Sequence, residues 1–282
     1  MNPSKLAVFV VHQSMSVIVA AFLLGAACGP VHAGTISAPS GLKYGDAFRI
    51  IFVTAGTTDA TSTHVADYDD FVNSQANSAT YNGSLVHWSV VGSTDTVNAY
   101  QYIGESSAGV YMVDGTKVAN STIRGLGTHG LWSCDLLAQP TAGIDGTVFS
   151  GVTVWTGTAG NGVTYETING KFGLGSTNHG PNNYFGGAVT EVGRVPGAGP
   201  ISYDWVEAGG IPSVHINSQQ YQMYAISDVL VYSVPEPSSF ALAVLGWIGL
   251  AFSASRKRRL AGRLTRGRGA DGRITVLPGV EL

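Results

Sequence analysis

Cysteine and charge are both scarce in this sequence. Its 282 residues include two cysteines, and charged residues make up only 12%. Cys28 lies in a mostly apolar stretch near the start, so Cys134 is the single thiol of the rest. One thiol can form neither a disulfide framework nor a cysteine-based zinc site within one chain. We therefore expect the folded part to depend on a hydrophobic core for its stability.

Catalytic motifs are also missing. The chain has no GxSxG, no phosphate-binding loop and no nucleophile signature around Cys134. Gly125–Gly130 matches GxGxxG, but no clear strand precedes it and no long helix follows, so we interpret it as chance in a chain with 38 glycines. We expect no cofactor. The histidines of the central region show no HxH, HExxH or HxxxH spacing, and we therefore predict no metal site. These histidines are His64, His87, His129, His179 and His215.

Basic residues are rare in the centre of the chain and concentrated at its end. Residues 34–237 hold six lysines and arginines against sixteen aspartates and glutamates, whereas residues 256–282 hold eight basic and two acidic residues. Nucleic-acid binding depends on neutralising phosphates. The acidic centre therefore excludes a nucleic-acid partner.

The N-terminus has the order of a secretory signal peptide. Lys5 precedes an apolar segment over residues 16–27, and Val31 and Ala33 form a small-residue cleavage site before Gly34. Cys28 suggests a lipoprotein signal as an alternative, but Gly25 stands where such a signal normally has leucine. We predict a signal peptide over residues 1–33.

The C-terminal region combines prolines, an apolar run and a basic cluster. The apolar run, residues 238–255, has 18 residues and no charge, the lower limit for spanning roughly 30 Å of hydrocarbon. A buried core helix would not end in four consecutive basic residues, which instead hold that end of a membrane helix in the cytoplasm. The features in question are Pro235, Glu236, Pro237, Arg256, Lys257, Arg258 and Arg259.

This order of features resembles the PEP-CTERM proteins of Gram-negative bacteria. The resemblance implies that residues 234–259 are a sorting signal, read by a membrane transpeptidase of the exosortase type. That enzyme would remove the helix and release the protein to the cell surface or extracellular matrix, so that the contact with the membrane is transient. The chain departs from the family by continuing over residues 260–282, a basic tail that we assign to the cytoplasm. If the signal is not processed, the helix is a tether.

Residues 34–233 form one extracytoplasmic domain that we expect to be mostly β with one or two helices and long loops, an α+β fold. We predict a helix over residues 66–79, capped by Ser62 or Thr63, and an irregular region from residue 157 to about 212. We also predict that the first and last strands pair and that Trp155 is buried. The strands are predicted over residues 48–54, 85–91, 110–113, 116–118, 148–156 and 221–232, with a hairpin turn at Asp114–Gly115.

The order of these elements resembles the bacterial branch of the C-type-lectin-like fold. Its most specific pieces are residues 113–120 and 154–158. The resemblance implies that the first and last strands pair and that the middle loops carry any ligand site. Calcium-dependent sugar binding is not implied, because the acidic residue of the sugar-binding loop and the Trp-Asn-Asp strand are missing.

We consider two functions. The first is a non-enzymatic matrix or cell-surface protein that binds polysaccharide or another surface component through its loops, with Trp205 and Asp204 as candidate ligand residues. The alternative is a secreted polysaccharide hydrolase using an acid pair such as Asp204 and Glu207. Asp67, Asp69 and Asp70 are interpreted as a solvated first helical turn rather than a calcium site.

Overall fold

The computed structural model describes residues 34–125, 128–133, 135–180, 186–195, 205–208 and 214–233, together with Trp247. The chain divides into two compact units, residues 1–232 and 233–282. The first unit contains the helices α2 (Val65–Gln75) and α3 (Ala99–Tyr102). The strands are β1 (Ala47–Val53), β2 (Thr80–Tyr81), β3 (Ser84–Leu85), β4 (Trp88–Val90), β5 (Gly109–Tyr111), β6 (Lys117–Ala119), β7 (Thr153–Trp155), β8 (Glu166–Thr167), β9 (Gly170–Lys171), β10 (Val189–Arg194), β11 (Val214–Ile216), β12 (Gln222–Ser227) and β13 (Leu230–Val231).

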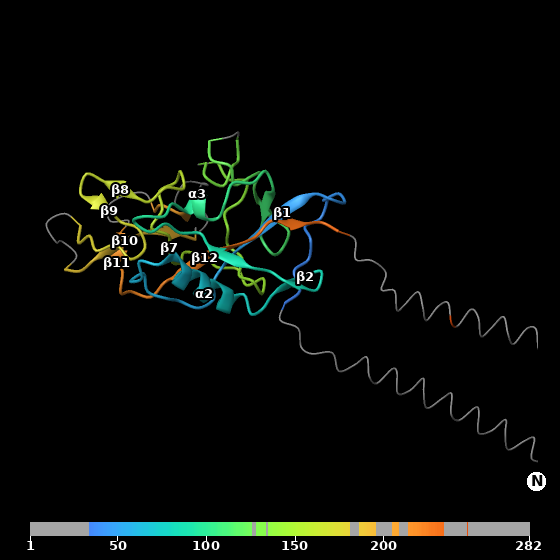
Figure 1. The fold of residues 1–282 in the computed structure, drawn as a ribbon, viewed down its shortest axis with the longest axis horizontal. Coiled ribbons are helices and arrows are strands. Elements are labelled where there is room, and N and C mark those ends of the chain that lie inside the picture. The colour runs from blue at the N-terminus through green and yellow to red at the C-terminus, as the bar shows by residue number, and fades with distance from the viewer. Residues whose placement is uncertain are drawn as a thin grey trace, which may run out of the picture. The chain divides into compact units, whose positions relative to one another are not determined.

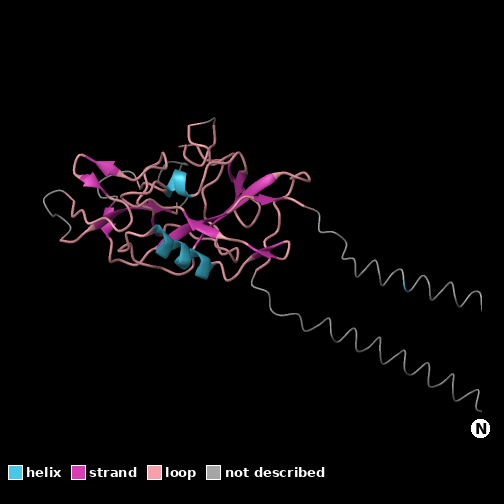
Figure 2. Ribbon diagram, viewed as in Figure 1, coloured by secondary structure: helices cyan, strands magenta, loops and turns pink. Residues whose placement is uncertain are grey.

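A central sheet organises the described part of the chain, which is mostly β, as predicted (Figures 1 and 2). Its strand order is β11-β10-β7-β12-β1-β5-β6, with β13 also paired to β1 and β4 also paired to β12. β1 lies antiparallel to β12 and β13 and parallel to β5. The predicted pairing of the first and last strands is confirmed.

The sequence of β1 explains its central place. Phe48, Ile50 and Phe52 belong to one cluster of buried side chains, and Ile51 and Val53 belong to the other. Side chains alternate between the two faces of a strand, so apolar residues at both alternating positions bury both faces. Arg49 interrupts the run, and its buried guanidinium donates to the backbone oxygen of Ile103 at 2.9 Å. Each fully buried side chain of this size contributes about 1.5–3 kcal/mol. The run therefore places two hydrophobic cores on opposite faces of one sheet.

Helix α2 forms where its periodicity predicts it, but it begins differently and ends sooner. It covers Val65–Gln75, and its N-cap is His64, whose side chain makes no capping hydrogen bond. The predicted caps are wrong in detail. Ser62 Oγ accepts the backbone N–H of His64 at 3.1 Å and donates to Asp67 Oδ2 at 2.5 Å, so it orders the entry to the helix from outside.

The predicted hairpin at Asp114–Gly115 is confirmed. β5 and β6 pair antiparallel on either side of it. Gly115 has a φ of 86°, a left-handed conformation that glycine adopts without steric cost. Asp114 Oδ1 accepts the backbone N–H of Thr116 at 2.8 Å, which closes the turn.

The region predicted to be irregular contains strands instead. β10 lies inside the central sheet, paired with β7 and β11, and β8 and β9 form a separate hairpin. Strand β7 is shorter than predicted, and the strand predicted over residues 85–91 divides into β3 and β4. Glycine at position 193 is required in β10, because a Cβ there would lie 2.1 Å from the backbone oxygen of Trp205. This close contact brings the loop around Trp205 against the sheet.

Candidate functional site

The described fold ends immediately before the predicted sorting segment, residues 234–259. In β13, Val231 lies opposite Ala47 of β1. The backbone N–H of Tyr232 donates to the oxygen of Asp46 at 2.8 Å, and the N–H of Gly45 donates to the oxygen of Tyr232 at 2.9 Å. In the sequence, only Ser233 and Val234 separate Tyr232 from the first proline of the segment. The ordered backbone thus continues to the start of the segment.

The predicted sorting residues lie outside the described residues. They are Pro235, Glu236, Pro237, Arg256, Lys257, Arg258 and Arg259. The signal peptide over residues 1–33 and the tail over residues 260–282 lie outside them too, and of the apolar run over 238–255 only Trp247 is described. Among the described residues, none forms a helix with the length and hydropathy needed to cross a membrane.

The first residues of the domain lie at the same end of the fold as Tyr232. Thr35 bridges to Thr80 in β2, while β8, β9, β10 and β11 lie at the opposite end (Figure 1). Therefore the chain enters and leaves the domain on one side, away from the loops around β8–β11.

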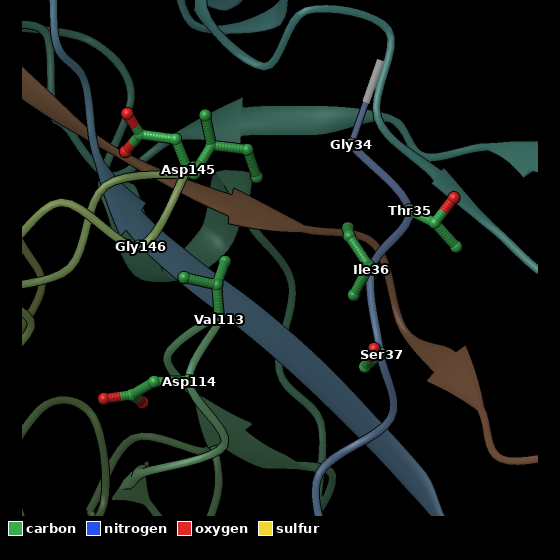
Figure 3. A pocket seen from close by; sticks show the side chains of 9 residues that line it. Gly34, Thr35, Ile36, Ser37, Val113, Asp114, Asp145 and Gly146 are labelled. Carbon is green, nitrogen blue, oxygen red and sulfur yellow. The ribbon is translucent and has the colours of Figure 1, made fainter. Parts of the chain in front are cut away.

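A pocket of about 210 Å³ lies at this end and is lined by residues 34–37, 113–114 and 144–146 (Figure 3). Its carboxylates have structural partners. Asp145 Oδ1 accepts the N–H of Thr147, and Asp145 Oδ2 accepts its hydroxyl, both at 2.9 Å. These hydrogen bonds lower the pKa of Asp145. Asp114 closes the hairpin turn, so both acids hold turns together.

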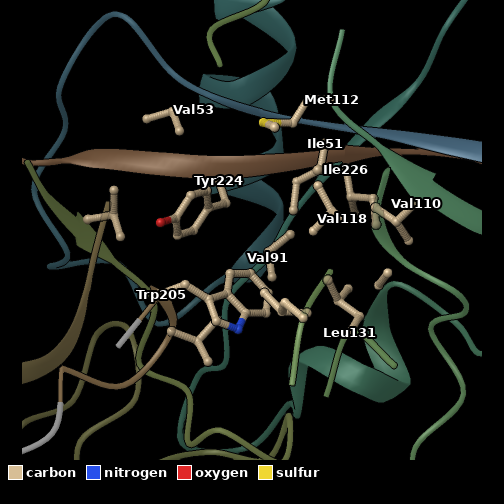
Figure 4. Close-up of a cluster of buried hydrophobic side chains, with 14 of the residues drawn as sticks. Ile51, Val53, Val91, Val110, Met112, Val118, Leu131, Trp205, Tyr224 and Ile226 are labelled. Atoms are coloured by element: carbon tan, nitrogen blue, oxygen red, sulfur yellow. The ribbon is translucent and has the colours of Figure 1, made fainter. Parts of the chain in front are cut away.

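Trp205 lies in the hydrophobic core. Its side chain is 0% exposed and stacks on Trp132, with ring centroids 6.1 Å apart. It also meets Tyr224 edge-on at 5.4 Å, among the aliphatic side chains seen in Figure 4. An indole enclosed in this way offers no face on which a sugar could stack. Trp205 thus has a packing role in this structure, which differs from the predicted role in ligand binding.

The acid pair proposed for hydrolysis is only partly described. Asp204 lies outside the described residues. Glu207 is half-buried, and its Oε2 accepts the backbone N–H of Gly160 at 2.8 Å. This hydrogen bond joins the loop after Trp205 to the loop after β7, a structural use of the carboxylate.

The acidic turn of α2 is not uniformly solvated, which corrects the prediction for Asp69. Its side chain is buried, whereas Asp67 and Asp70 are exposed. Asp69 Oδ1 accepts the N–H of Val90 at 2.8 Å, and Asp69 Oδ2 accepts the hydroxyl of Tyr102. The sequence gives little indication of this role, because the receiving strand β4 is distant along the chain.

Asn73, one helical turn further along α2, completes the contact with β4. Its amide donates to the oxygen of Trp88 at 2.7 Å, and its Oδ1 accepts the N–H of Trp88 at 3.1 Å. β4 pairs with β12 through its other edge. Side chains of α2 therefore satisfy the free backbone groups of an edge strand, which would otherwise be open to pairing with another chain.

Burial raises the pKa of Asp69, while the hydrogen bonds from Tyr102 and Val90 act against that rise. A folded-state pKa above the unfolded value means that the native state binds more protons between the two values. The contribution of Asp69 to stability is therefore greatest at pH values below the unfolded pKa and falls as pH rises through the folded pKa.

The histidines are dispersed over the fold. Nδ1 of His215 lies 2.7 Å from the hydroxyl of Tyr221, and burial lowers the pKa of His215. Nδ1 of His87 lies 3.9 Å from Asp228 Oδ2 on the surface. Among the described residues, no group of three or more histidine, cysteine, aspartate or glutamate side chains is arranged to hold a metal ion.

Comparison with known families locates the functional signal at the end of the chain. Residues 233–259 match the family described as the PEP-CTERM protein-sorting motif. No curated protein matches the chain. The matched range begins at the residue after Tyr232, whose backbone pairs with Gly45 and Asp46. The chain therefore carries the C-terminal sorting motif of PEP-CTERM proteins, which are exported, sorted to the cell surface and processed by exosortase, a membrane enzyme.

Proposed function

We propose that this protein is a non-enzymatic component of the cell surface or extracellular matrix. It is made as a single-pass membrane precursor and released from its helix by an exosortase-type transpeptidase. The observation that carries the proposal is the match of residues 233–259 to the sorting motif. The apolar run followed by Arg256–Arg259 supports the topology, because clustered basic residues resist translocation and leave the preceding domain outside.

We assign the domain to a C-type-lectin-like fold that binds matrix polysaccharide or another surface component. Two features support this assignment: the pairing of β1 with β12 and β13, and the position of the β8–β11 loops at the end of the domain away from Tyr232. Loops at that end would remain accessible while the chain is still attached through its C-terminal segment. Since Trp205 is buried, the ligand contacts are assigned to the exposed loops instead.

Replacing Glu236 by alanine tests the sorting role. The variant changes the motif but keeps the apolar run and the basic cluster. In a host that carries the sorting enzyme, wild type should appear outside the membrane fraction in a shortened form, and Glu236→Ala should accumulate at precursor size in the membrane. If both proteins remain in the membrane at precursor size, the segment is a tether. Binding is tested separately by screening the purified domain, residues 34–233, on a glycan array.

A further inference from the structure

A group of aromatic and polar side chains lies where β11 leads into β12. The hydroxyl of Tyr221, just before β12, lies 2.7 Å from Nδ1 of His215 in β11 and donates to Oε1 of Gln219 at 3.0 Å. The rings of His215 and Tyr221 also meet edge-on, with centroids 5.2 Å apart. The three side chains therefore form one hydrogen-bonded group, at the end of the domain to which the ligand contacts are assigned (Figure 1).

The backbone beneath this group is held firmly by the rest of the fold. Tyr221 exchanges two backbone hydrogen bonds with Thr58, at 2.9 and 3.0 Å. Its ring packs on the hydrophobic core through the buried indole of Trp155, with centroids 4.9 Å apart. In the turn before it, the buried amide of Asn217 donates to the backbone oxygen of Ser176 at 3.0 Å. The group is thus ordered before a ligand arrives, which lowers the entropic cost of binding.

The outer part of the group is open to solvent and carries no charge. Gln219 is exposed, as are its neighbours Ser218 and Gln220, whereas His215 and Tyr221 are half-buried. Tyrosine combines an apolar ring with a polar tip, a combination that suits a partly wet contact. This surface can therefore offer hydrogen bonds and an aromatic ring to the same ligand.

The hydrogen bonds determine which groups a ligand would meet. In this orientation of its amide, Oε1 of Gln219 can only accept, so it takes the hydroxyl proton of Tyr221, and the hydroxyl oxygen accepts Nδ1–H of His215. Burial lowers the pKa of His215, and Arg194 adds to this effect while the hydrogen bond with Gln219 opposes it. The imidazole is therefore neutral at pH 7, with Nε2 as an acceptor, and the Gln219 amide supplies N–H donors.

These groups are complementary to a pyranose ring. The hydroxyls of a sugar both donate and accept hydrogen bonds, and they match the Gln219 amide and Nε2 of His215. The C–H groups on the face of the sugar are apolar and can pack on the ring of Tyr221. The group therefore has the chemistry that the buried Trp205 cannot supply.

The charge of the domain selects among polysaccharides. Residues 34–237 hold six basic and sixteen acidic residues, so the domain repels a polyanion, over about 10 Å at 0.1 M salt. An anionic chain could pair with Arg194, whose charge acts on His215, but it would be repelled by the rest of the domain. An uncharged chain meets no such repulsion.

We propose that Tyr221, His215 and Gln219 form a sugar platform and that its ligand is an uncharged hexopyranose polysaccharide. This inference rests on the proposed function, because it names the residues and the class of ligand for the proposed polysaccharide binding. The ring of Tyr221 packs against the sugar, and His215 and Gln219 bind its hydroxyls.

Affinity electrophoresis of the full-length protein tests the sugar platform. The protein is kept soluble in a non-ionic detergent whose head group contains no sugar. The native gels contain hydroxyethylcellulose, dextran or galactomannan as uncharged probes, or alginate as the anionic probe. At least one uncharged probe should retard wild type, and alginate should not. Tyr221→Ala should weaken the apparent affinity at least about tenfold, as expected for an aromatic contact at the centre of a binding site.

Two milder variants separate binding from packing. Gln219→Ala changes an exposed side chain, and Tyr221→Phe keeps the ring on Trp155 but removes the hydroxyl that orders the other two residues. Each should weaken the apparent affinity by about three- to tenfold, the value of one neutral hydrogen bond, while thermal melts followed by circular dichroism confirm the fold. Tyr44→Ala and Tyr44→Phe, at a tyrosine that is 77% exposed, are the matched controls and should bind as wild type does.

The sugar platform is refuted if Gln219→Ala and Tyr221→Phe are both retarded as strongly as wild type. The class of ligand is refuted if alginate retards wild type at least as strongly as the uncharged probes do. Either result leaves the proposed polysaccharide binding in place. By contrast, if none of the four probes retards wild type, the proposed polysaccharide binding fails together with the platform, whereas the sorting role is judged separately by the fate of Glu236→Ala.

Discussion

Replacing Trp155 by alanine should destabilise the domain more than most single substitutions. Its side chain is 0% exposed, its Nε1–H donates to the backbone oxygen of Thr58 at 2.9 Å, and its ring lies 4.9 Å from that of Tyr221. Truncating a buried tryptophan costs about 3–5 kcal/mol, and the lost hydrogen bond adds about 0.5–1.5 kcal/mol. We therefore expect a loss of about 4–6 kcal/mol in the free energy of unfolding.

The measurement is denaturant and thermal unfolding of the purified domain, followed by circular dichroism so that the signal does not depend on the missing indole. For a domain of this size the loss corresponds to a Tm lowered by roughly 10–20 °C. Trp155→Phe keeps most of the packing and should lose less than about 3 kcal/mol. Tyr44→Ala, at a side chain that is 77% exposed, is the control and should stay within about 0.5 kcal/mol of wild type. A loss below about 2 kcal/mol for Trp155→Ala would refute the packing argument.

Two further substitutions test the fold. Because burial raises the pKa of Asp69, lowering the pH from 7 toward 4 should stabilise wild type relative to Asp69→Asn, measured as the difference in free energy of unfolding. Asp70→Asn, at an exposed side chain, is the control. If the difference in free energy of unfolding between wild type and Asp69→Asn stays constant with pH, Asp69 does not have a raised pKa in the folded state. Gly193→Ala should cost about 1–3 kcal/mol in urea unfolding, since its Cβ would lie 2.1 Å from a backbone oxygen. Gly34→Ala, with nothing within 4 Å of its Cβ, should be neutral, and equal stability of the two variants would show that the close contact is not real.

Sequence periodicity predicts the parts of the fold that depend on local hydrophobic pattern. The run Phe48–Val53 is apolar except for Arg49, and α2 repeats its apolar residues at helical spacing, so both elements are found near their predicted positions. The pairing of the first and last strands is different, because it joins distant residues such as Ile51 and Ile226. It is predicted from the resemblance to a known fold and not from a local hydrophobic pattern.

The missed elements depend on contacts between distant residues. In β10, Glu191, Gly193 and Arg194 interrupt the apolar pattern, so the sequence alone indicates a loop. The glycine is needed because the chain around Trp205 passes so close to the strand. The close contact between this part of the chain and β10 also buries Trp205. Because Trp205 lies in a glycine-rich segment, the sequence alone indicates an exposed side chain that could bind a ligand.

The candidate functional residues also fall into a part that can be predicted from the sequence and a part that cannot. The sorting signal is a linear motif whose prolines, apolar run and basic cluster can be read in order, and the family match agrees with the sequence prediction. The proposed ligand site would depend on the arrangement of loops in the fold. The burial of Trp205, its candidate residue, therefore could not be predicted from the neighbouring residues in the sequence.

The most direct test of the central claim is the intact mass of the protein recovered from outside the cytoplasmic membrane of a host that carries the sorting enzyme. A sorted protein should begin at Gly34 and should lack the apolar run over residues 238–255. Its mass therefore identifies both processing events in one measurement. Recovery of the protein only from the membrane, with a mass that still includes residues 238–282, would contradict release by sorting and would make the C-terminal segment a permanent anchor.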